Sequence, residues 1–341
     1  MLQSFHARKT NARGVTNASA QEQRENIQKR IETTKKALEY AQLASYVYEH
    51  YEHKTGGTEL PAEWEVMDKK ELHALGVTAE MLRDQTDKDG HSFAAVVLKS
   101  TSQKKIVISY RGSVGTPLFS HNWVSNINEG SGQRDYTTEH TMAMELAEKM
   151  QRALAMSDEW KDYSLSFAGH SLGGGLASAA SIVTGLDAFT MDSAPVRIKT
   201  IATYLKCSED DVKERIKAVA EGLKTMHTTT DPITNVFPTA HGEAHSVQPA
   251  GAHQHEATVF WGPSALGISD RPLVTAAMSP LFAIAAILVI ATGQGGPGTH
   301  NYMPLGGALY EAGKRALAGH DHKFLISALR EDIARMEKGL R

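Results

Sequence analysis

The spacing of apolar and polar residues predicts the secondary structure in the first half of the 341-residue chain. Residues 21–51 begin as a charged helix and become amphipathic, since apolar residues recur there at helical intervals. Residues 92–98 and 105–110 are short apolar runs joined by a polar turn, which is typical of neighbouring strands. Residues 138–156 again have an amphipathic helical pattern. The expected order is therefore helix, strand, strand, helix.

Strands and helices continue to alternate in the second half of the chain. Strand-like runs occur at residues 163–168, 187–191 and 222–227, with helical patterns between them. This alternation predicts an α/β fold with a mostly parallel central sheet flanked by helices, because parallel neighbours need a crossover connection. One domain is expected over residues 23–341, after a polar segment, residues 1–22, that predicts disorder.

One segment departs from this alternation. Residues 273–292 carry no charged side chain, and residues 281–290 are continuously apolar. The segment approaches the ~20 residues that a membrane span requires, but Pro280 interrupts it and neither end has a basic cluster. Three interpretations stay open: a buried core helix, a lid or membrane-touching helix, and a transmembrane span. The segment lies within an insert at about residues 241–299.

The most specific chemical motif is the stretch from Gly169 to Gly173, which has the pattern G-x-S-x-G of a nucleophile elbow. It lies between a strand-like run and a run of small, helix-compatible residues, as that motif requires. Glycines flank the serine because a Cβ atom would collide with neighbours in so tight a turn. We expect Ser171 to be a nucleophile, and the backbone N–H of Leu172 to be an oxyanion donor.

A serine nucleophile needs a base within hydrogen-bond reach and an acid that orients the base. In α/β-hydrolases the chain order is serine, acid, histidine. Asp231 follows the strand-like run 222–227 closely and is the expected acid, with Asp192 as its alternative. His300 and His320 each precede a helix-like segment and are the main candidates for the base, and His322 is a further one.

The second oxyanion donor is expected directly after strand 105–110, where Ser113 has both a backbone N–H and a hydroxyl. Three motifs of the chain resemble those of a known family. Residues 106–113 resemble the oxyanion motif of the class 3 lipases, and residues 169–174 are similar to the elbow of that family. Residues 230–233 look like its acid loop. The resemblance implies an α/β-hydrolase fold.

Two further segments resemble bacterial phospholipase and lipase effectors. Residues 121–132 are similar to their tryptophan motif and following glycines, although Asn122 stands where those effectors usually have Asp. His320 and the apolar residues after it resemble their C-terminal histidine and helix, which favours His320 over His300 as the base. The insert at residues 241–299 has no clear counterpart in fungal-type lipases.

The resemblance implies a serine carboxylester hydrolase of the lipase or phospholipase A type. Its triad is Ser171, Asp231 and His320, and the reaction passes through an acyl-enzyme. Lipid or phospholipid is the implied substrate, and residues 273–292 are expected to contact the membrane surface. Two alternatives stay open. One is a soluble esterase or thioesterase, and the other is a non-enzymatic, membrane-inserting effector with a degenerate hydrolase fold.

Composition and charge narrow the remaining classes of function. Lysine and arginine number 36 and aspartate and glutamate 39, well mixed, so no nucleic-acid surface is expected. The single cysteine allows no disulfide framework, which suits a reducing compartment. His241 and His245 have metal-like spacing but lack the glutamate of a zinc helix, so no metal is expected there. The hydrolase reaction implies neither a metal nor an organic cofactor.

The N-terminus lacks the apolar region of a signal peptide. We therefore expect the protein to be cytoplasmic in the producing cell. The resemblance to effectors adds export by a specialised secretion system, to act on membranes. An immunity or chaperone protein is a candidate partner, which the sequence does not identify.

Overall fold

The structure is a computed structural model, and structural statements below concern the residues that it describes. These are residues 3–52, 58–83, 93–112, 138–194, 196–219, 222–228, 244–247, 257–261 and 322–340. Within these ranges, no helix combines the length and the apolar character needed to cross a membrane. The apolar segment 273–292 lies outside the described residues, so its three interpretations stay predictions.

The described strands form one eight-stranded sheet in the order β1-β2-β3-β4-β5-β6-β8-β7. Their bounds are β1 Glu65–Val66, β2 Ala95–Ser100, β3 Lys105–Tyr110, β4 Ser164–His170, β5 Ala188–Met191, β6 Leu223–Thr228, β7 Ala244–Val247 and β8 Ala257–Trp261. Strands β3 to β6 are parallel neighbours, as predicted. The remaining pairs are antiparallel, so a parallel centre is flanked by antiparallel edges and the sheet is mixed.

The antiparallel edges have a local cause. A four-residue turn, residues 101–104, joins β2 to β3, and so short a connection can only return the chain antiparallel. At the other edge, β7 and β8 pair with each other and β8 pairs with β6. Both strands lie within the predicted insert at residues 241–299, so part of that insert extends the sheet.

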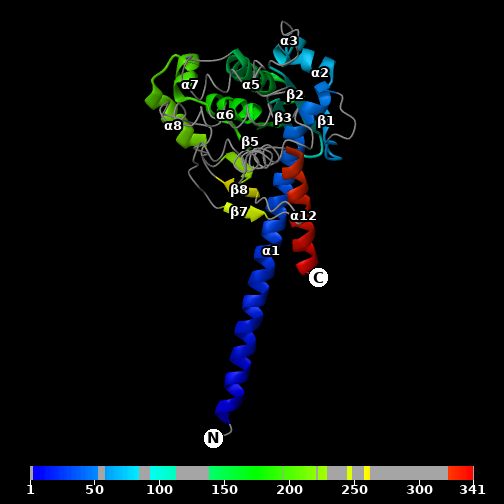
Figure 1. Cartoon of the computed structure of the whole chain (residues 1–341), viewed down its shortest axis with the longest axis vertical. Helices are drawn as coiled ribbons and strands as arrows, with labels where there is room; N and C mark the ends of the chain where they lie inside the picture. The colour runs from blue at the N-terminus through cyan, green and yellow to red at the C-terminus, as the bar shows by residue number, and fades with distance from the viewer. Residues whose placement is uncertain are drawn as a thin grey trace, which may run out of the picture.

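Helices cover both faces of the sheet (Figure 1). Their bounds are α1 Gln3–Glu52, α2 Lys69–Ala74, α3 Ala79–Leu82, α5 Thr138–Met156, α6 Leu172–Thr184, α7 Ile198–Leu205, α8 Glu209–Val219 and α12 His322–Leu340. Helices α5 and α6 pack on one face, around Ile106, Ile108 and Phe167. On the opposite face, α1 and α12 pack around Val107 and Ala168 of the same two central strands. The predicted layering of an α/β-hydrolase fold is therefore confirmed.

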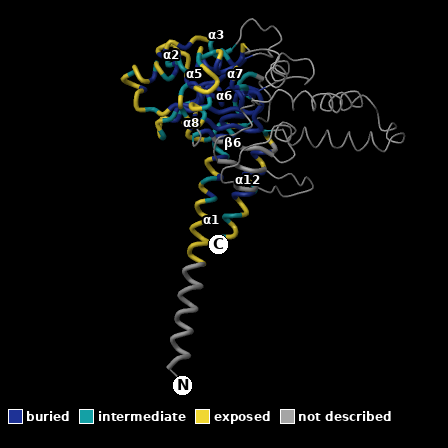
Figure 2. Tube along the Cα trace, turned by 90° about the vertical axis from the view of Figure 1, so that its left-hand side faces the viewer, coloured by how far each residue is buried: buried dark blue, intermediate teal, exposed yellow. Residues whose placement is uncertain are grey.

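Helix α1 extends well beyond the sheet, as Figure 1 shows. It begins at Gln3 and so includes most of residues 1–22, for which disorder remains the sequence-based prediction. Figure 2 shows that α1 is buried where it meets the sheet and is mostly exposed over residues 20–29. Helix α12 runs back along α1, since Tyr48 stacks on His322 and Lys35 pairs with Glu337. This arrangement brings the C-terminal helix to the centre of the sheet.

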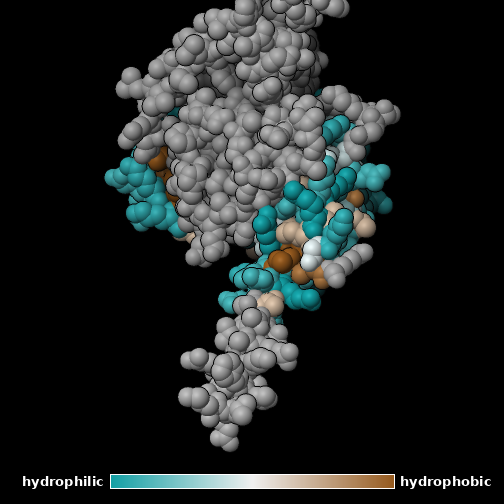
Figure 3. All heavy atoms as spheres, turned by 60° about the horizontal axis from the view of Figure 1, so that its bottom comes forward, coloured by the Kyte–Doolittle hydropathy of each residue, from teal (hydrophilic) through white to brown (hydrophobic). Residues whose placement is uncertain are grey.

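The surface of the described residues is largely polar. Figure 3 shows mostly hydrophilic side chains where α1 leaves the body, with a small hydrophobic group among them. Met156 is the one large apolar side chain that is strongly exposed among the described residues. The apolar residues of α1 and α12 whose burial is described therefore pack mainly against the sheet and against each other.

Candidate active site

The candidate active site is built on the sharp turn between β4 and α6. Ser171 occupies this turn with φ 58° and ψ −127°, a conformation that residues with a side chain rarely adopt. A Cβ atom added to Gly169 would lie 2.1 Å from the carbonyl oxygen of Gly173. One added to Gly173 would lie 2.1 Å from the carbonyl oxygen of Tyr110. Both flanking glycines are thus required by backbone contacts, as expected for a nucleophile elbow.

Hydrogen bonds to the end of β5 hold this strained turn in place. The backbone N–H of Ser171 donates to the carbonyl oxygen of Met191 (3.0 Å). The N–H of Ala194 donates in turn to the carbonyl oxygen of Ser171 (2.9 Å). Asp192, the alternative acid, lies between these two anchors, fully buried and with a positive φ of 40°. Asp231, the expected acid, lies outside the described residues.

The end of β3 lies directly beside the elbow. A Cβ atom added to Gly112 would come within 3.1 Å of the Cβ of Ser171 and 2.5 Å of the carbonyl oxygen of His170. Leu172 is the first residue of α6, so its N–H belongs to the free N-terminal turn of that helix. The predicted oxyanion donor Ser113 lies outside the described residues, but its predecessor Gly112 is in place next to the nucleophile.

One described residue at this site was missed by the sequence analysis. The hydroxyl of Tyr48 on α1 accepts a hydrogen bond from the N–H of Gly112 (3.0 Å). It also lies 3.1 Å from Nδ1 of His170 and 3.4 Å from the carbonyl oxygen of His170. In sequence, Tyr48 is one of several tyrosines on an amphipathic helix, and helical spacing does not distinguish it from Tyr40.

The histidine candidates are only partly described. His300 and His320 lie outside the described residues. His322 begins α12 and stacks on the ring of Tyr48, with 4.9 Å between ring centroids and 8° between ring planes. Its ring centroid is also 5.4 Å from that of His170. The start of α12 therefore reaches the residues that surround the elbow. The assignment of His320 as the base stays a prediction.

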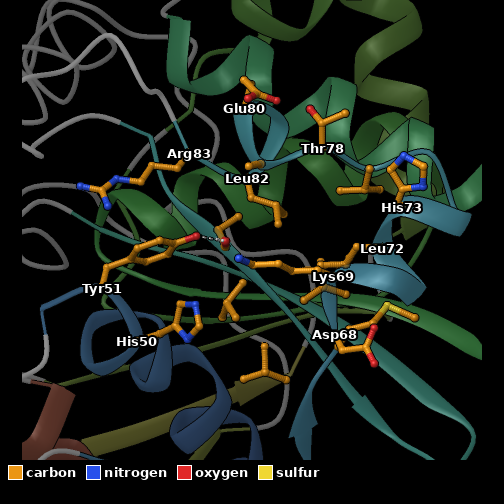
Figure 4. Close-up of a pocket in the computed structure, with 17 residues that line it drawn as sticks. His50, Tyr51, Asp68, Lys69, Leu72, His73, Thr78, Glu80, Leu82 and Arg83 are labelled. Atoms are coloured by element: carbon orange, nitrogen blue, oxygen red, sulfur yellow. Dashed lines mark hydrogen bonds between the residues drawn. The ribbon is translucent and has the colours of Figure 1, made fainter.

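A separate cavity of about 800 Å³ lies along the outer side of β2. Figure 4 shows His50 and Tyr51 from α1 on one side of it, and Leu82 and Arg83 on another. The Tyr51 hydroxyl donates to the carbonyl oxygen of Ala95 (2.8 Å), and burial raises the pKa of that phenol. Among the described candidates, neither Ser171 nor Asp192 nor His322 lines this cavity, so it is separate from the elbow.

The chain is similar to known phospholipase-like proteins. The family model described as "Phospholipase-like: Tle-like phospholipase domain" matches residues 39–265, which is more than half of the chain. An extracellular phospholipase A1 of Serratia liquefaciens is 28% identical over 199 residues, covering 57% of this chain and 55% of that protein. The chain thus spans about half the length of this relative.

Two solved lipase structures also show similarity. The Lip2 lipase of Yarrowia lipolytica is 14% identical, with a TM-score of 0.39, over 68% of this chain and 85% of that one. A lipase of Rhizopus microsporus var. chinensis is 17% identical, with a TM-score of 0.29, over 48% and 59% of the two chains.

Proposed function

Because the chain belongs to the family of Tle-like phospholipase domains, we propose that it is a serine carboxylester hydrolase that cleaves acyl esters of lipids. One observation carries the proposal: Ser171 is held in a strained turn between a central strand and the N-terminus of a buried helix. Backbone strain of this kind persists only where the surrounding structure enforces it, and it concentrates at functional sites. A serine there presents its hydroxyl at the carboxyl edge of the sheet.

In the proposed reaction, the hydroxyl oxygen of Ser171 attacks the ester carbonyl while His320 accepts the hydroxyl proton. The N–H groups of Leu172 and Ser113 hold the oxyanion that forms. His320 returns the proton to the leaving alcohol, and an acyl-enzyme remains. Water then attacks the acyl group, and the fatty acid leaves as Ser171 recovers its proton. Asp231 orients the imidazole and stabilises its charged form, with Asp192 as the alternative.

Phospholipid is the proposed substrate, of the phospholipase A type, with neutral lipid as the lipase alternative. The Serratia relative, named as a phospholipase A1, supports this choice. Residues 273–292 are proposed to contact the lipid surface or to line the path of the acyl chain. The protein is further proposed to be exported by a specialised secretion system and to act on membranes. An immunity or chaperone protein is its proposed partner.

The test compares Ser171→Ala with Ser178→Ala. Both serines are buried, Ser171 at the elbow and Ser178 in the helix that follows it. The Ser178 hydroxyl donates a hydrogen bond to the carbonyl oxygen of Gly174 within that helix. Each variant is incubated with phosphatidylcholine vesicles and with emulsified triglyceride, and released fatty acid is identified by mass spectrometry. Loss of the nucleophile is expected to lower kcat by about 10⁴-fold or more, whereas Ser178→Ala retains activity.

Other outcomes point to the alternatives. Cleavage of short-chain esters without cleavage of vesicles or emulsions would indicate a soluble esterase or thioesterase. Lipid release that persists in Ser171→Ala would indicate a membrane-inserting effector that makes no use of the elbow.

A further inference from the structure

We infer that Tyr48 is a positioning residue for ester hydrolysis, which fixes the oxyanion segment after β3 against the nucleophile elbow. The inference rests on the proposed function and adds to it a residue from a remote helix. Tyr48 lies on α1, 64 residues before Gly112 and 122 residues before His170. Its hydroxyl nevertheless contacts both.

The hydroxyl of Tyr48 forms hydrogen bonds with two backbone segments. A backbone N–H can only donate, so the Tyr48 oxygen must accept the hydrogen bond from Gly112. The Tyr48 O–H donates to the backbone carbonyl oxygen of His170 (3.4 Å). The oxygen also lies 3.1 Å from Nδ1 of His170, where the direction of the hydrogen bond depends on the tautomer of the imidazole. One hydroxyl therefore joins the end of β3 to the last residue of β4, and that residue directly precedes Ser171 in the chain.

This bridge lies where the two segments approach each other most closely around Gly112. A Cβ atom at Gly112 would lie 2.2 Å from the Tyr48 oxygen and 3.1 Å from the Cβ of Ser171. Gly112 is thus enclosed between the tyrosine and the nucleophile, with its N–H directed at the tyrosine. The next residue, Ser113, supplies the proposed oxyanion donor. A displacement of such a donor by about 1 Å is enough to slow a reaction by about 100-fold.

The tyrosine is itself held rigidly. Its side chain is among the buried residues where α1 crosses the sheet, with 9% exposed. His322 of α12 stacks on its ring, and His170 approaches the ring edge-on, with 6.0 Å between centroids. The two helices that pack on this face of the sheet therefore meet at the elbow, and each contributes one ring to the cluster.

The test is Tyr48→Phe, which removes the hydroxyl and keeps the ring that stacks on His322. Tyr40→Phe is the matched control. Tyr40 lies on the same helix, is also 9% exposed, and forms its hydroxyl contact with Ser166 (3.4 Å) rather than with the elbow. Both variants and the wild type are assayed on a short-chain p-nitrophenyl ester and on phosphatidylcholine vesicles.

Active sites are counted with a p-nitrophenyl phosphonate, which reacts with the serine and places an oxygen where the oxyanion forms. We expect Tyr48→Phe to lower kcat per active site by about 10- to 100-fold, below the 10²–10³ typical of a deleted donor because the donor is only displaced. KM should change little, and phosphonylation should slow in parallel with kcat. Tyr40→Phe should match the wild type.

The alternative outcomes are distinct. If Tyr48→Phe loses only titratable sites and keeps the wild-type kcat per site, the residue is merely structural and the inference is overturned. The titration counts folded sites alone, so partial unfolding of the variant does not obscure this result. If wild-type protein neither hydrolyses esters nor reacts with the phosphonate, the proposed function itself fails and the inference fails with it.

Discussion

Gly169→Ala is a substitution for which the structure predicts a large loss of stability. The new Cβ atom would lie 2.1 Å from the carbonyl oxygen and 2.3 Å from the carbonyl carbon of Gly173. Ordinary contact begins at 3.4 Å, so these atoms would have to separate by more than an ångström. The obstacle is backbone rather than the end of a flexible side chain, and no rotamer change can relieve it.

The expected magnitude follows from where the displaced backbone lies. Overpacking in a core costs about 1–3 kcal/mol where neighbours can adjust. Here the first turn of α6, which contains Gly173 and directly follows the elbow, would have to move. We therefore expect a loss at or above about 3 kcal/mol in the free energy of unfolding, together with loss of esterase activity.

Gly339→Ala is the matched control for this substitution. Gly339 lies near the end of α12 with no atom within 4 Å of its added Cβ. The same change should stabilise the protein by up to about 1 kcal/mol through helix propensity. Urea unfolding followed by circular dichroism measures both variants. A loss below about 0.5 kcal/mol for Gly169→Ala, within the range of surface substitutions, would refute the argument from backbone contact.

Two further predictions concern charged groups. Asp332 is buried at the α1–α12 contact and forms ion pairs with Arg30 (3.4 Å) and Arg335 (3.1 Å). Asp332→Ala should therefore lower the midpoint of urea unfolding clearly. Asp158→Ala breaks only an exposed ion pair and should leave that midpoint unchanged. Asp68 caps α2, and hydrogen bonds from backbone N–H groups, that of Glu71 foremost, hold its pKa below the ordinary 3.8. Its contribution to stability is therefore complete above pH 3.8 and is lost as the pH falls through the lowered pKa. Asp68→Asn keeps a cap that does not titrate, so the stability difference between wild type and variant should change only in that acidic window.

Much of the fold was predictable because its signals are local. The helical and strand periods identified β3, α5 and β4 nearly to their observed bounds, and the alternation of strands and helices from β3 onward predicted the parallel centre of the sheet. The antiparallel edges were not predicted, although the short turn at residues 101–104 requires β2 and β3 to pair in that way. The antiparallel pairing of β8 with β6 has no such local signal. The two short strands β7 and β8 fall in a stretch without clear period, which was interpreted only as an insert.

The candidate site divides in the same way. The elbow has a short sequence motif, so its glycines and serine were recognisable in order along the chain, although the carbonyl oxygen that requires Gly173 belongs to the remote Tyr110. The hydroxyl of Tyr48 has no such signature, because a buried tyrosine on an amphipathic helix has the same pattern whether it contacts Ser166 or the elbow. The contact that each tyrosine forms depends on where α1 packs along the sheet.

The sequence by itself therefore determined the α/β order of elements and the motif of the strained turn at Ser171, because periodicity and the close approach of Gly169 to Gly173 are local. Only the tertiary structure decided which remote side chains surround that turn. Helices α1 and α12, from opposite ends of the chain, bury their apolar faces on the same side of the sheet. That burial brings Tyr48 and His322 to His170, and contacts between residues so distant in sequence arise from packing rather than from any local pattern.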